Sequence, residues 1–210
     1  MGISLFLRGG KDLLEREAIK EIYKEYMEGM ANIMKEDEDA PFNLGPAGSW
    51  LEPKTIPVGL SISFGMLSGI QYPPVEWKQE TADATVLLAN KRLYIFILWT
   101  QRKIRGKQIK TIFVGLPHYD IKNIKIKESK VFNEARLIVE YNGFHIMDSS
   151  NRAKSARFWM VFSKKKDIDY LGQKVNAAQM MGAWFELLMN QAKREKYDVD
   201  GIVVKEDIDL

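Results

Sequence analysis

The sequence contains no cysteine and only two histidines, His118 and His145. The absence of cysteine excludes disulfide bonds, thiolate zinc sites and cysteine nucleophiles. With two histidines, a histidine-rich metal site within one chain is nearly excluded. The sequence also lacks a glycine-rich phosphate loop, an internal repeat and a low-complexity segment. What remains, 46% hydrophobic and 28% charged over 210 residues, is typical of a globular protein with one large core.

Long apolar runs are scarce, and none of them predicts a targeting signal or a membrane span. The first residues carry too short an apolar run for a signal peptide, and Phe6 stands where a myristoylation signal has Ser or Thr. Residues 55–75 carry no charge, but three prolines and three glycines interrupt them and their apolar residues alternate. We therefore expect a cytoplasmic protein, with peripheral association at the membrane left open.

Charge is distributed unevenly along the chain. Residues 1–74 have a net charge of −4, residues 75–166 a net charge of +11, and residues 167–210 a net charge of −4. A basic middle attracts anions such as phosphoryl head groups, nucleic acid or an acidic protein surface. The alternative is that the acidic ends pack against the basic middle and neutralise it.

Composition divides the chain into four segments. Residues 1–40 contain an amphipathic helix over 12–36, and residues 41–57 form a linker rich in proline and glycine. Residues 58–196 form the main domain, and residues 197–210 form an acidic tail whose apolar patch, Ile202-Val203-Val204, could add an edge strand. The N-terminal helix has three open roles, namely packing on the domain, pairing with its own copy in a homo-oligomer, or docking a partner.

Most of the main domain is predicted to be strand. Six apolar residues alternate from Ile56 to Met66 with small residues or proline between them, so one face of this strand is buried and the other is nearly bare. The continuous run from Leu93 to Trp99 indicates a strand buried on both faces. Asn142-Gly143 predicts a hairpin turn. A helix over 168–195 has an apolar stripe wide enough to need a sheet beneath it.

The order of these elements resembles a pleckstrin-homology (PH) or GRAM-like domain. The residues that carry the resemblance form a short hairpin motif: Leu88, Asn90, Lys91, Arg92, Leu93 and Tyr94. The family has threonine at the position of Ala89. The stretch from Leu116-Pro117 to Asp120-Ile121 resembles the family's lead into a middle strand. The resemblance covers residues 83–195 and implies an α+β fold, an antiparallel barrel or sandwich of about seven strands capped by a C-terminal helix. It also implies a binding module for a protein partner or an anionic lipid head group.

The candidate binding site is a basic loop near Gly106, which carries five cations in nine residues: Arg102, Lys103, Arg105, Lys107 and Lys110. An arginine can bind two phosphate oxygens through paired N–H donors, whereas a lysine acts as a point charge. The alternative is a hairpin tip whose charges only keep it soluble. A second cluster, Lys164-Lys165-Lys166, precedes the C-terminal helix. Trp99 is either a core residue or a membrane-interface residue.

Other features give no sign of catalysis. His118 with Asp120, and His145 with Asp148, are histidine–acid neighbours in sequence. We interpret them as structural or surface residues because no nucleophile or oxyanion signature accompanies them. Asp198, Asp200 and Gly201 lack the further ligands of a calcium loop. We expect a non-enzymatic binding protein without cofactor or metal. The alternatives are a nucleic-acid-binding protein that uses the basic middle, which is disfavoured because the aromatics concentrate on apolar strands, and an enzyme without a recognisable motif.

Overall fold

The computed structural model describes six stretches of the chain and a few residues of the predicted N-terminal helix. The stretches are 54–64, 77–103, 106–147, 152–164, 167–170 and 173–209. The helix residues are Glu17, Lys20, Glu21, Ile22, Lys24, Glu25, Glu28 and Asn32, and all are helical. Lys24 and Glu28 form an ion pair at 3.8 Å on this helix. The rest of segment 1–40, most of the linker and the basic turn at Arg105 lie outside the described residues.

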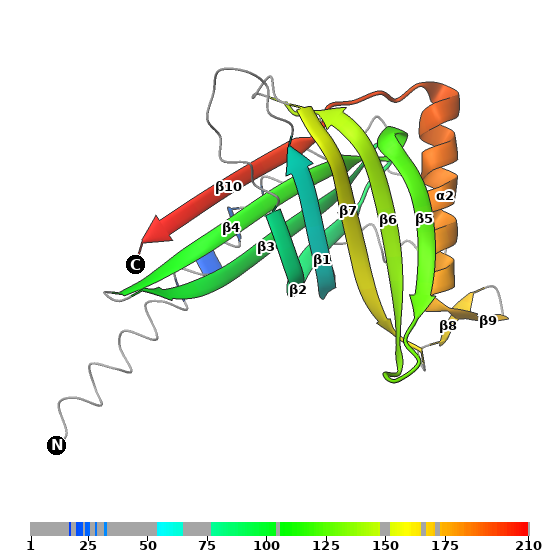
Figure 1. The fold of residues 1–210 in the computed structure, drawn as a ribbon, viewed down its shortest axis with the longest axis horizontal. Coiled ribbons are helices and arrows are strands. Elements are labelled where there is room, and N and C mark those ends of the chain that lie inside the picture. Colours follow the sequence, from blue (N-terminus) through cyan, green and yellow to red (C-terminus); the bar gives the residue numbers. More distant parts are fainter. Residues whose placement is uncertain are drawn as a thin grey trace.

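The fold is α+β, with an eight-stranded antiparallel sheet and one long helix near its C-terminal end (Figure 1). In chain order the elements are β1 (Lys54–Phe64), β2 (Trp77–Leu88), β3 (Arg92–Lys103), β4 (Gly106–Pro117), a 3-10 turn η2 (His118–Asp120), β5 (Ile121–Glu128), β6 (Glu134–His145), β7 (Arg152–Ser163), β8 (Asp167–Tyr170), β9 (Gln173–Asn176), α2 (Ala177–Glu195) and β10 (Ile202–Asp209).

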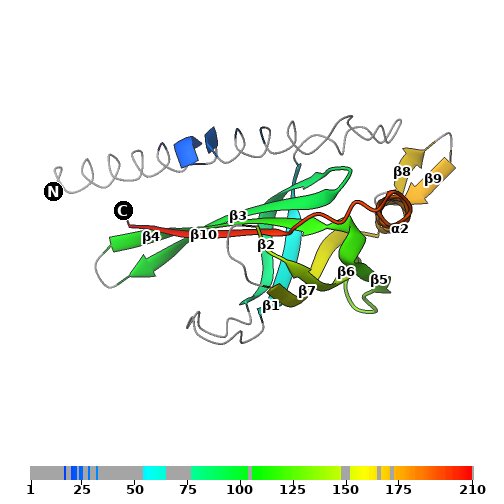
Figure 2. The same ribbon diagram turned by 90° about the horizontal axis from the view of Figure 1, so that it is seen from above.

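The large sheet has the strand order β10-β4-β3-β2-β1-β7-β6-β5, and β8 pairs with β9 separately. The sheet is strongly bent, so the half that contains β2, β3, β4 and β10 crosses the half that contains β5, β6 and β7 (Figures 1 and 2). Among the described residues no strand pairing joins β10 to β5, so the expected barrel is not closed. The two halves are joined through β1. They also approach each other at one corner, where the Gly201 N–H, just before β10, donates to the His145 carbonyl at the end of β6 at 2.7 Å.

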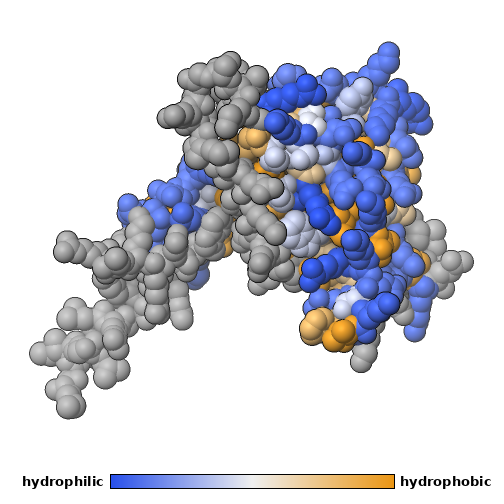
Figure 3. Space-filling model, viewed as in Figure 1, coloured by the Kyte–Doolittle hydropathy of each residue, from blue (hydrophilic) through white to orange (hydrophobic). Residues whose placement is uncertain are grey.

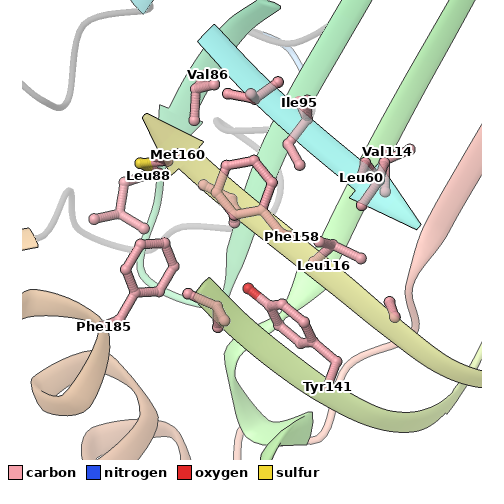
Figure 4. Close-up of a cluster of buried hydrophobic side chains, with 14 of the residues drawn as sticks. Leu60, Val86, Leu88, Ile95, Val114, Leu116, Tyr141, Phe158, Met160 and Phe185 are labelled. Carbon is pink, nitrogen blue, oxygen red and sulfur yellow. The ribbon is translucent and has the colours of Figure 1, made fainter. Parts of the chain in front are cut away.

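The core lies between the two halves of the sheet and under α2. Phe158 and Met160 of β7 approach Leu88 and Ile95 from across the fold, and Phe185 of α2 points toward the same residues (Figure 4). Phe158, Met160, Ile95 and Phe185 each have 0% exposure. The helix contacts η2, β5, β6 and β9. The apolar stripe of α2 therefore covers the open side of the bent sheet, as the sequence predicted for a capping helix.

The run from Leu93 to Trp99 is buried on both faces through Ile97, as predicted. Leu93, Ile95 and Ile97 belong to the main core, whereas Tyr94 and Phe96 belong to a second cluster with Phe113 on the other face of the sheet. Tyr94 and Phe113 stack with their ring centroids 6.0 Å apart. Trp99 lies in β3 next to Lys110 in the register, but its side chain is outside the described residues.

Two local predictions are wrong. Asn142 and Gly143 lie inside β6, whose register with β7 continues unchanged from Asn142–Ser155 to Phe144–Ala153, so no turn forms there. A Cβ on Gly143 would lie 2.6 Å from the Ala153 carbonyl oxygen, so glycine serves the close approach of β7. The predicted helix over 168–195 begins only at Ala177. The Asn176 side chain caps its first turn, accepting from the Ala178 N–H at 3.0 Å, and the preceding residues form the β8–β9 hairpin.

The segment boundaries also change at both ends of the domain. The sheet begins at Lys54, inside the predicted 41–57 linker. Residues Ile202–Asp209 form β10 on the edge of β4, so this part of the acidic tail belongs to the sheet. The apolar patch of the tail thus adds the edge strand that its sequence suggested.

Two glycines make a matched test of packing. A Cβ on Gly182, inside α2, would lie 3.5 Å from Ile126 Cδ1, an ordinary contact, whereas a Cβ on Gly59 would overlap the Trp159 ring. We expect Gly182→Ala to raise the free energy of unfolding by about 0.5–1 kcal/mol, because alanine is the better helix former. Gly59→Ala should lower it by about 1–3 kcal/mol through overpacking. Urea unfolding checks both, and a shift in the same direction for the two variants contradicts this packing.

Candidate functional site

The predicted basic loop is a β-hairpin rather than a loop. Residues Arg102 and Lys103 end β3, Lys107 and Lys110 lie in β4, and the register places Arg102 opposite Lys107. Gly106 has φ = 115°, which confirms the predicted turn near this residue. Arg105 and the side chains of Arg102, Lys103 and Lys107 are outside the described residues. The hairpin therefore brings four of the predicted site positions into two paired strands.

Lys110 is partly neutralised by the acidic C-terminal strand. Its ammonium group lies 3.5 Å from a carboxylate oxygen of Asp207 in β10. Beside this pair, the Gln108 side-chain amide donates to Asp209 at 3.1 Å. The hypothesis that the acidic ends cancel the basic middle is thus correct at this place. An incoming anion would have to compete with Asp207 for Lys110, which weakens this residue as an anion-binding position.

The hairpin motif that carries the family resemblance, Leu88 to Tyr94, has a structural role. Arg92 is 2% exposed, and its Nε donates to the Asp200 carbonyl at 2.8 Å. Burial lowers the pKa of Arg92 from its ordinary value. The Lys91 ammonium group lies 5.5 Å from the centroid of the Tyr197 ring. These contacts hold the β2–β3 turn against the segment between α2 and β10. Asp200, for which the sequence did not predict a calcium site, serves the fold through its backbone carbonyl.

His118 has the structural role expected for it, with a different partner from the one in sequence. It is fully buried, and its Nε2 lies 2.8 Å from the Ala89 carbonyl oxygen rather than against Asp120. Its ring meets the Phe185 ring edge-on with the centroids 6.0 Å apart. Burial lowers the pKa of His118 to about 4, so the ring is neutral at neutral pH.

A group of titratable side chains lies near the corner where the sheet halves meet. Burial, and then the charge of Asp198, raise the pKa of Asp120 to about 6, while Arg152, His145 and Lys193 act in the opposite direction. Asp198 and His145 are exposed. Asp148, the sequence neighbour proposed for His145, is outside the described residues. In the described part of the chain no three His, Asp or Glu side chains are grouped as metal ligands.

A group of exposed cations lies on the outer side of β5, β6 and β7. Leu137, Val139 and Tyr141 of β6 point into the core, so the residues between them face outward. Lys127 is the register partner of Arg136, and Arg157 is the partner of Glu140. We call this surface the cationic face, and it comprises four exposed residues: Lys125, Lys127, Arg136 and Arg157. Figure 3 shows hydrophilic residues gathered over these strands.

One acidic and one aromatic residue lie among these cations. Glu140 accepts from the Lys125 ammonium group at 3.2 Å, and this bond, followed by the charges of Lys125 and Arg157, lowers the pKa of Glu140. Trp159 lies next to Ile138 in the register and is half-buried, with its ring over Gly59 of β1. The predicted bare face of β1 is therefore where Trp159 packs.

The cationic face is not among the sites that the sequence predicted. Lys125 and Lys127 alternate with Ile124 and Ile126 in the sequence. This period-two spacing, together with Arg136 on the next strand, was the available signal. Arg157 lies on a third strand and joins the group only through the register of β6 and β7. Lys164 of the second predicted cluster lies instead at the β5–β6 turn, where its ammonium group donates to the Ser129 carbonyl at 2.7 Å.

Comparisons of the chain with protein-family models, with curated proteins and with solved structures give no match. Among the described residues, no helix has the length and apolar character needed to cross a membrane.

Proposed function

We propose that this protein is a PH/GRAM-like binding module that binds anionic lipid head groups at a membrane surface. The topology supports the family part of the proposal. Seven consecutive strands follow the order β4-β3-β2-β1-β7-β6-β5 in one bent sheet, and α2 comes next in the chain, after the small β8–β9 hairpin, and packs over the open side. The resemblance implies such an arrangement of about seven strands and a capping helix. The additional strand β10 extends it at the edge of β4.

The observation that carries the binding part is the cationic face. Lys127, Arg136 and Arg157 are exposed on one side of three neighbouring strands, and Lys125 is the member that is bonded to Glu140. A surface of this sign raises the local concentration of anions. Each basic residue near an anionic leaflet contributes about 1 kcal/mol of attraction. Several such residues on a rigid sheet give a usable membrane affinity.

The test is sedimentation with vesicles made of equal parts of phosphatidylcholine and phosphatidylserine. We expect Lys127→Ser with Arg136→Ser to weaken binding by about 30-fold, which corresponds to about 1 kcal/mol for each cation. The matched control is Lys174→Ser with Arg194→Ser, which removes the same charge from β9 and α2 and should bind like the wild type. A third variant, with serine at four positions, measures the contribution of the β3–β4 hairpin: Arg102, Lys103, Arg105 and Lys107.

Equal loss of binding in the cationic-face variant and its control would show that net charge, not this surface, attracts the vesicles. Absence of wild-type binding to these vesicles would overturn the proposal as a whole. Both variants change exposed side chains, so thermal unfolding should be nearly unchanged.

Single-stranded nucleic acid is a second candidate ligand, which the position of Trp159 favours. Nucleic-acid-binding surfaces combine cations that follow the backbone with aromatic rings on which bases stack. Trp159 is half-buried on the cationic face. It lies two residues from Arg157 on β7 and in the same register row as Lys125, with Ile138 between them. Salt-dependent retention of an oligonucleotide, weakened by Trp159→Leu, would support this candidate. Absence of any oligonucleotide binding by the wild-type protein would exclude this candidate.

A further inference from the structure

The turn between β5 and β6 presents two apolar side chains to solvent. Val131 is 84% exposed and Phe132 is 66% exposed, the two largest exposures among the large hydrophobic residues that the structure describes. Figure 3 shows apolar atoms at this end of the hairpin, beyond the hydrophilic strands. Contiguous exposed apolar surface marks interaction sites more often than single scattered apolar residues do.

Hydrogen bonds fix the backbone that carries these side chains. The Ser129 Oγ accepts from the Phe132 N–H at 2.9 Å and from the Val131 N–H at 3.3 Å. Lys164, at the end of β7, donates through its ammonium group to the Ser129 carbonyl, and its own N–H donates to the Asn133 carbonyl at 3.1 Å. The turn is therefore already ordered in the conformation that exposes Val131 and Phe132. A preorganised element loses less entropy on binding than a flexible one.

Cations lie beside the tip, between it and the cationic face. Lys130 is an exposed neighbour of Val131, and Lys164 forms an ion pair with Glu128 at 3.4 Å. Lys127 and Arg136 form the last row of the cationic face before the turn. At the rise of a strand they stand about 10 Å behind the tip. An interfacial element enters the boundary between head groups and acyl chains by about 5–10 Å, so these cations would lie at the level of the lipid phosphates.

We propose that the β5–β6 turn inserts Val131 and Phe132 into the head-group region of an anionic membrane, while Lys127, Lys130 and Arg136 contact the lipid phosphates. This inference rests on the proposed function and assigns the orientation of the module on the bilayer. A membrane fits this surface better than a protein partner, because a stable protein interface buries about 800 Å² on each partner and the apolar part of the tip is two side chains. A bilayer accepts a small apolar anchor together with nearby cations.

The absence of cysteine from the chain makes a direct test possible. Phe132→Cys provides a unique thiol for an environment-sensitive fluorophore, and Leu187→Cys, at a 51% exposed position on α2, provides the matched control. With vesicles of equal parts phosphatidylcholine and phosphatidylserine, the fluorophore at residue 132 should shift to the blue and become shielded from an aqueous quencher. The fluorophore at residue 187 should keep its aqueous spectrum.

A second measurement uses Val131→Ser with Phe132→Ser in vesicle sedimentation. We expect about 30-fold weaker binding, because burial of two apolar side chains is lost. Leu187→Ser should change binding by less than about twofold.

If the tip variant and the wild type bind equally while the cationic-face variant of Lys127 and Arg136 binds more weakly, tip insertion is wrong and the proposed function stands. If the wild type binds no anionic vesicles, both fail. A spectral shift at residue 132 that follows protein concentration without vesicles indicates a second copy as the occupant and overturns the insertion.

Discussion

Truncation of Phe185 to alanine should lower the free energy of unfolding by about 3–5 kcal/mol. The side chain is fully buried and lies where α2 meets the two halves of the sheet (Figure 4). It packs in the same core as Leu88 and Met160 and meets the His118 ring edge-on. Its removal leaves a cavity that several elements line, and such a site collapses only partly. The loss should therefore lie at the upper end of single-residue effects in this protein.

Leu187→Ala is the matched control on the same helix, because Leu187 is 51% exposed. We expect its free energy of unfolding to change by about 0.5 kcal/mol or less. Urea unfolding followed by circular dichroism measures both variants. Similar small losses for Phe185→Ala and Leu187→Ala would mean that α2 does not cap the core.

His118→Leu should change how stability depends on pH. In the folded protein burial lowers the pKa of His118 to about 4, whereas an unfolded chain titrates near about 6.5. Between these values the unfolded state binds the proton and the folded state does not, so wild-type stability falls as the pH falls from about 6.5 to about 4. The full effect is about 3 kcal/mol. The leucine variant lacks this pH-dependent loss of stability.

The variant also loses the bond between Nε2 and the Ala89 carbonyl, which costs about 1 kcal/mol at neutral pH. We therefore expect His118→Leu to be less stable than the wild type near neutral pH, and the gap to close or reverse as the pH approaches about 4. Asp120 titrates in an overlapping range with the opposite sign, because its folded pKa is raised to about 6, but it is present in both proteins and its effect cancels in the difference. Urea unfolding across this pH range checks the result, and a constant gap would mean that His118 is not buried in its neutral form.

Much of the sheet could be predicted because its signals are local. The alternation from Ile56 places Val58, Leu60 and Ile62 in the core, and these three residues are at most 1% exposed. The continuous run from Leu93 is buried on both faces because each face of β3 packs on a different cluster. The position of α2 on the sheet follows from the width of its apolar stripe.

The errors arise where tertiary contacts override a local signal. Asn142-Gly143 has the composition of a turn, but pairing with β7 on both sides keeps it extended. Among the described residues the sheet does not close, because no pairing joins its edge strands β10 and β5. β10 lies on the edge of β4, and no local pattern states which edge an acidic strand will choose. The same pairing brings Asp207 to Lys110, which reduces the predicted anion site.

The cationic face and the apolar tip, Val131 and Phe132, could not be predicted from the sequence because both depend on tertiary contacts. Arg157 is separated from Lys125 by two strand connections, and only the register of three strands unites them. Nothing in the local sequence singles out Val131 and Phe132, and their exposure follows from the bonds that Ser129 and Lys164 make at the turn.

The most direct test of the central claim is a binding titration of the wild-type protein with vesicles of increasing phosphatidylserine content at two salt concentrations. If the cationic face binds anionic head groups, affinity should rise with phosphatidylserine content and fall as salt is added. Binding that is absent, or that is equal on pure phosphatidylcholine and insensitive to salt, would contradict the account.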